Sequence, residues 1–95
     1  MHVEVNENGP SVHEATDLKR LAVVCGERAH LDALGDLGTV DGDHVWLSID
    51  ALREAAGATV PDDERAAWAE GFDGMIAFAA KHGWVQGPTV RAHIE

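Results

Sequence analysis

The sequence predicts a small α+β protein in which a three-stranded sheet is covered by helices, in the order strand, helix, helix, strand, helix, helix, strand. Three observations predict this class. Apolar and polar residues alternate near both ends of the chain, a turn dipeptide precedes an alternating segment in the middle, and a long amphipathic pattern comes before the last strand. A length of 95 residues is typical of one domain. We therefore expect residues 1–95 to form a single α+β domain.

The beginning of the chain is expected to hold a strand followed by a helix. Residues 2–5 alternate between polar and apolar side chains, as in a half-buried strand. Ser11 and Glu14 have the spacing of a capping box, and apolar residues recur at helical spacing from there to Cys25, which favours a helix. The short apolar run that ends at Cys25 is also compatible with a buried strand, because periodicity does not distinguish the two.

Two helices and a hairpin are expected in the middle of the chain. Leucines at every third position within residues 28–37 predict a short helix. An Asp-Gly dipeptide precedes the alternating residues 44–47, which indicates a small β-hairpin. Ser48 directly follows the hairpin and is placed to cap a helix that runs to Ala56.

A long amphipathic helix is expected before the last strand. Pro61 and the three acidic residues after it suit a helix N-terminus, and Gly83 marks the end. The apolar residues of this helix fall within an arc of roughly 100°: Trp68, Phe72, Met75, Ile76 and Ala79. Residues 89–94 alternate again, so we expect a terminal strand with the long helix covering the sheet.

Composition excludes several classes of partner. Seventeen Asp and Glu against seven Lys and Arg give a net charge of −10. Nucleic acid and anionic membranes are therefore not expected as partners, because both attract positive surfaces. A single cysteine excludes an intramolecular disulfide and a cysteine-based zinc site. No signal segment opens the chain and no apolar run approaches the ~20 residues that span a bilayer, so we expect a cytoplasmic protein.

Histidines are the candidate chemical groups. His2, His44 and His93 alternate away from the apolar faces of the expected strands, so strand pairing would place them on one face of the sheet. Imidazole binds Zn²⁺ and exchanges protons near neutral pH, so this set predicts a metal site or an acid–base site. The other interpretation is an exposed polar sheet face or a subunit contact, which is typical of a half-solvated sheet.

Aromatic side chains outside the main apolar stripe are the candidate contact residues. Trp46 lies on the polar face of its strand, Phe78 and His82 lie four residues apart beside the helix stripe, and Trp84 follows the helix. Aromatic residues are enriched at the centres of interfaces, and a short chain gains buried surface by dimerising. This pattern predicts a homodimer.

We therefore expect a non-enzymatic, cytoplasmic protein-interaction or accessory module that is homodimeric, with a further protein partner also compatible. No cofactor is expected, because the sequence contains no phosphate-binding glycine loop, and neither serine lies in a nucleophile-elbow motif. The alternative is a small histidine-dependent enzyme, using Zn²⁺ or general acid–base catalysis, with its site at a subunit interface.

Overall fold

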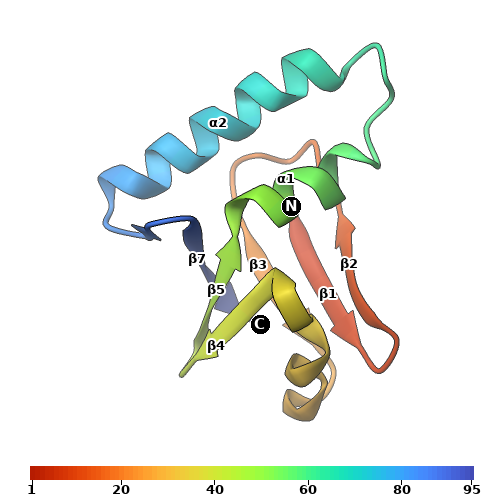
Figure 1. The fold of residues 1–95 in the computed structure, drawn as a ribbon, viewed down its shortest axis with the longest axis vertical. Coiled ribbons are helices and arrows are strands. Elements are labelled where there is room, and N and C mark those ends of the chain that lie inside the picture. Colours follow the sequence, from red (N-terminus) through yellow and green to blue (C-terminus); the bar gives the residue numbers. More distant parts are fainter.

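A computed structural model describes residues 1–95. Its centre is a mixed, seven-stranded β-sheet that curls into a half-barrel (Figure 1). The strands are β1 (His2–Asn6), β2 (Gly9–His13), β3 (Ala22–Cys25), β4 (Gly38–Asp41), β5 (His44–Ser48), β6 (Val85–Gln86) and β7 (Thr89–Ile94). The helices are the 3-10 helix η1 (Arg28–Leu37) and the α-helices α1 (Ile49–Gly57) and α2 (Arg65–Lys81).

Strand β7 joins the two halves of the sheet. The strand order is β2-β1-β3-β7-β5-β4, with β3 parallel to both β1 and β7 and the remaining pairs antiparallel. One edge of β7 pairs with β5 along nearly its whole length. The other edge is shared, because Val90 pairs with β6 whereas His93 and Ile94 pair with β3. Arg91 therefore lies between two different neighbours on the same edge.

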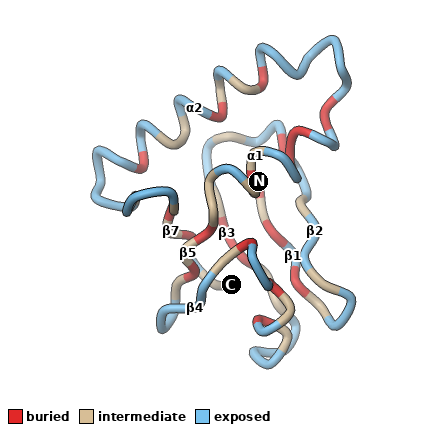
Figure 2. Tube along the Cα trace, in the orientation of Figure 1, coloured by how far each residue is buried: buried red, intermediate tan, exposed pale blue.

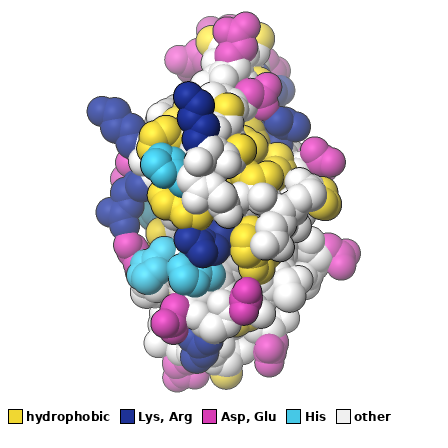
Figure 3. Space-filling model, turned by 90° about the vertical axis from the view of Figure 1, so that its left-hand side faces the viewer, with side chains coloured by type: hydrophobic (Ala, Val, Ile, Leu, Met, Phe, Trp, Pro, Cys, Tyr) yellow, Lys and Arg dark blue, Asp and Glu magenta, His cyan; other side chains and the backbone are white.

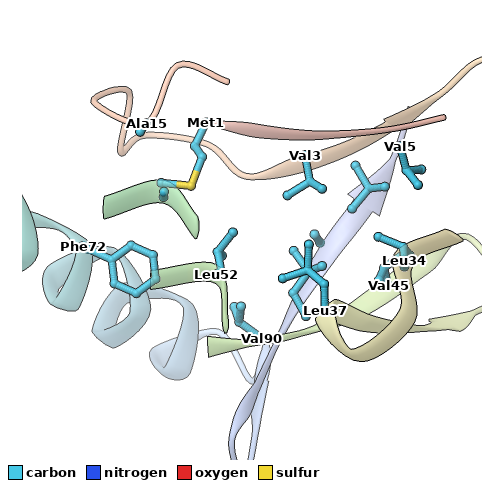
Figure 4. Packing of buried hydrophobic residues seen from close by; sticks show 14 of the residues in the cluster. Met1, Val3, Val5, Ala15, Leu34, Leu37, Val45, Leu52, Phe72 and Val90 are labelled. Atoms are coloured by element: carbon cyan, nitrogen blue, oxygen red, sulfur yellow. The ribbon is translucent and has the colours of Figure 1, made fainter. Parts of the chain in front are cut away.

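The core fills the inner side of the half-barrel. Side chains alternate along a strand, and the inward ones are buried, while the outer side of α2 and the loop tips are exposed (Figure 2). Figure 4 shows Val3 on one wall and Val90 on the other, with Leu37 of η1 and Leu52 of α1 between them. No polar or charged residue is buried. The core is therefore held together by apolar burial.

Helix α2 crosses one end of the half-barrel (Figure 1). Trp68 and Phe72 on its N-terminal half reach the core, with ring centroids 5.2 Å apart. The Trp68 indole Nε1 donates a hydrogen bond to the Ala15 carbonyl oxygen at 2.7 Å, which connects the helix to the loop between β2 and β3. None of the helices has the length and apolar character needed to cross a membrane.

The expected three-stranded sheet in the order strand, helix, helix, strand, helix, helix, strand is wrong. The structure has seven strands, and the segment expected to be a helix from Ser11 to Cys25 contains β2, a loop and β3. The Ser11 hydroxyl contacts His13 Nε2 at 3.0 Å instead of capping a helix. The apolar run that ends at Cys25 forms the buried strand β3, as the alternative interpretation predicts. Its valines suit a strand that pairs with a neighbouring strand on each edge.

Several local predictions are confirmed. The hairpin forms between β4 and β5, and the Ser48 hydroxyl caps α1 by accepting a hydrogen bond from the Ala51 amide at 3.2 Å. The long helix before the last strand is α2, and the last strand is β7. The short helix over residues 28–37 is a 3-10 helix with a break at Gly35, where φ is 56°.

Replacing Gly38 with alanine should destabilise the protein by about 1–3 kcal/mol, because overpacking a core has that effect. An added Cβ would lie 2.8 Å from Val45 Cγ1, 3.0 Å from Leu47 Cδ2 and 3.1 Å from the Trp46 carbonyl oxygen. Urea titration measures the free energy of unfolding. Gly26→Ala is the matched control, since nothing lies within 4 Å of a Cβ at that position. Equal losses in the two variants would contradict this account of the packing.

Candidate functional site

A groove of about 740 Å³ lies between the C-terminal half of α2, the loop that precedes β3, and strand β7. Its walls are mostly apolar. The apolar lining comes from all three elements and from the segment after α2, and includes Leu18, Leu21, Met75, Ile76, Phe78 and Trp84. The volume falls within the range of small-molecule sites.

Two glycines of α2 shape the groove. Gly71 lets Leu18 lie against the helix, since a Cβ there would be 2.6 Å from Leu18 Cδ1. Gly74 lines the groove, and nothing lies within 4 Å of where its Cβ would be. The wall of the groove is therefore tight beside Gly71 and open beside Gly74.

Positive charge is concentrated at the groove, although the whole chain is strongly acidic. Lys19, Arg20 and Arg91 line it, which is three of the chain's seven Lys and Arg residues, and none of the seventeen acidic residues does. Arg20 forms an ion pair with Glu95, whereas Lys19 and Arg91 form none. The face turned toward the viewer in Figure 3 shows basic, histidine and hydrophobic side chains together. Such a site attracts negative charge locally.

An aromatic cluster stands at the mouth of the groove. It consists of Phe78 and His82, whose ring centroids are 4.5 Å apart, and Trp84, whose ring stacks on His82 at 4.7 Å. Phe78 is 58% exposed and Trp84 is 36% exposed. The Arg91 guanidinium lies over the Trp84 ring, 6.0 Å from its centroid. Phe78 and Trp84 are the largest apolar side chains that the protein exposes.

Trp46 is set apart from the aromatic cluster. It lies opposite Arg91 in the register of β5 and β7, and its indole Nε1 donates to Asp41 Oδ2 at 3.1 Å. Of the four expected contact residues, the structure brings Phe78, His82 and Trp84 together. The fourth, Trp46, lies on the neighbouring strand β5, on the other side of Arg91.

The candidate histidines lie in one row across the sheet. The register pairs His13 with His2, His2 with Ala22, Ala22 with His93, and His93 with His44. The rings of His44 and His93 are 5.8 Å apart, and the ring of His2 stacks on His13 at 5.1 Å. Strand β3 separates His2 from His93, which puts about 9.5 Å between their strands.

The structure therefore brings His44 and His93 together at the groove and keeps His2 away from them. No group of three or more His, Cys, Asp or Glu side chains is arranged to hold a metal ion. A catalytic zinc needs three protein ligands, and His44 and His93 supply two. Within one copy of the chain, this pair can donate or accept protons but does not complete a metal site.

The basic side chains of the groove were missed in the sequence. Lys19-Arg20 is the only pair of adjacent basic residues in this acidic chain, and leucines flank it on both sides. A basic pair between leucines indicates a positively charged site next to apolar surface. Arg91 carried no such signal, because its place in the groove depends on how β3 and β6 share the edge of β7.

No family model, curated protein or solved structure matches this chain. The function is therefore inferred from the chain's own side chains.

Titrating tag-free protein with Zn²⁺ should leave the melting temperature unchanged, because only an ion that binds the native state stabilises it. His44 and His93 lack a third ligand within the same copy. Differential scanning fluorimetry measures the shift. A rise in melting temperature that disappears in both His44→Ala and His93→Ala would contradict this expectation and indicate that a second copy completes the site.

Proposed function

We propose that this chain is a non-enzymatic, cytoplasmic interaction module, and that it acts as a homodimer whose contact is centred on the aromatic cluster of Phe78, His82 and Trp84. The observation that carries the proposal is the exposure of these rings. Phe78 is 58% exposed although it lies on a helix whose other large apolar side chains pack inward. An exposed group of aromatic rings is typical of the centre of an interface.

The small size of the core supports self-association. Only 20 of the 95 residues are buried. Short chains bury a smaller fraction of their surface, and a second copy supplies the missing contact. A two-fold contact would place the same rings of both copies against one another. Because Phe78 and Trp84 also line the groove, the second copy would cover part of its mouth.

The charges around the aromatic cluster predict how salt affects the dimer. Arg91 lies over the Trp84 ring and Lys81 directly precedes His82 in the chain, so a two-fold contact centred on the rings brings like charges near one another at its rim. Two copies with a net charge of −10 also repel at long range. Salt screens both effects. The dimer is therefore expected to become tighter as the salt concentration rises.

The side chains of the groove support binding rather than catalysis. The lining contains no Ser, Cys, Asp or Glu, so the groove itself supplies His44 and His93 with no nucleophilic hydroxyl or thiol and no carboxylate partner. The alternative of a histidine-dependent enzyme requires a second copy to supply that group at the subunit interface. The adjacency of His44 and His93 is the observation in its favour.

Phe78→Ala should weaken the dimer at least tenfold, which corresponds to about 1.4 kcal/mol, because it removes the most exposed ring of the aromatic cluster. Sedimentation equilibrium at two salt concentrations measures the dissociation constant. Val40→Ala is the matched control, since Val40 is a 37% exposed apolar side chain on β4, outside the aromatic cluster.

A chain that stays monomeric at all accessible concentrations would contradict the homodimer. Equal weakening by Phe78→Ala and Val40→Ala would show that the contact lies elsewhere. A dimer that becomes weaker with added salt would contradict the proposal that like-charged side chains, including Lys81 and Arg91, repel one another at the rim of the contact.

A further inference from the structure

We infer that the groove beside α2 binds a small amphipathic anion, with an apolar body and a single carboxylate head. This inference goes beyond the proposed function, and the groove is formed within one copy of the chain, although the proposed dimer would cover part of its mouth. It rests on the volume of the groove, on its apolar walls and on the unpaired cations within it.

The walls of the groove fit an apolar body. Met75 and Ile76 of α2 face the groove opposite Leu18 and Leu21 of the loop before β3. These four side chains are only partly covered in the folded protein and pack at the margin of the core. Covering them with a ligand removes further apolar surface from water, which is the main source of affinity in sites of this volume.

Arg91 is the best-placed group for a carboxylate head. Its guanidinium has no ion-pair partner and lies over the face of Trp84. Held over an aromatic ring, a guanidinium keeps its N–H donors free to bind a carboxylate with two parallel hydrogen bonds. Lys19 adds a second unpaired cation, and His93 adds a further donor when protonated.

The distribution of charge limits the occupant to a small one. All seventeen acidic residues lie outside the lining of the groove, so an extended polyanion such as nucleic acid would meet repulsion beyond it. A single carboxylate on an apolar body places its only charge beside Arg91 and Lys19. The groove therefore selects for one negative charge combined with an apolar tail.

Three ligands with the same ten-carbon chain test the head group: decanoate, decanol and decyltrimethylammonium. Titrations followed by ¹⁵N–¹H NMR on the full chain measure affinity and locate the site. We expect decanoate to bind at least tenfold more tightly than decanol, with decyltrimethylammonium weakest. The perturbed amides should belong to residues 18–21, 74–79 and 90–93.

Arg91→Gln should remove most of the preference for decanoate over decanol, with Lys19 retaining the remainder, and should leave decanol binding unchanged. Arg28→Gln is the matched control. It makes the same change of charge on η1, where Arg28 donates to the Gly42 carbonyl oxygen and does not line the groove. We expect it to alter neither affinity by more than twofold.

Gly74→Leu tests the groove without loss of the fold. Its Cβ meets nothing within 4 Å, and leucine favours a helix more than glycine does, so the melting temperature should not fall. The added side chain occupies the groove, and binding of both decanoate and decanol should fall at least fivefold.

Each other outcome overturns a defined part of the inference. Equal affinities for decanoate and decanol would overturn the carboxylate head while leaving an apolar groove. Absence of binding by both, or perturbed amides outside the groove, would overturn the site itself. Because the dimer is measured separately, by sedimentation of the ligand-free protein, none of these results decides the proposed function.

Discussion

The structure depends on one constraint, which is that β7 must pair on both edges at once. Strands β1, β2 and β3 form one half of the sheet and β4 and β5 the other, and only β7 connects them. Its antiparallel pairing with β5 places Val90 opposite Leu47 and Ala92 opposite Val45 in the core, and its parallel pairing with β3 places Ile94 beside Val23. The apolar core closes only when residues far apart in the chain have met, which is typical of slow, non-local folding.

The same constraint places the groove. Strands β3 and β6 meet one edge of β7 from opposite ends, and Arg91 lies where one ends and the other begins. The loop before β3 and the helix before β6 diverge at this point and leave apolar surface between them. The positive charge of Arg91 in the groove of this acidic chain is thus placed by the strand topology and not by the overall composition.

Local signals in the sequence predicted the elements whose structure is local. The Asp-Gly turn, the cap at Ser48 and the apolar stripe of α2 each depend on neighbours a few residues away. The segment from Ser11 to Cys25 was misread, because a capping pattern and helical spacing competed with strand-forming valines and only long-range pairing decided between them. The row of histidines followed from strand alternation, but the position of Ala22 between His2 and His93 depended on an unseen third strand.

Helix α2 is anchored unevenly along its length. Trp68 and Phe72 pack firmly into the core, whereas two glycines in the middle of the helix, Gly71 and Gly74, weaken its backbone just before the half that overhangs the groove. Amide protons beyond Gly74 should therefore exchange with solvent through a local opening of lower free energy than the one that exposes Trp68. The C-terminal turns of α2, whose one buried residue is Ala79, are therefore expected to loosen more readily than the turns that carry Trp68 and Phe72.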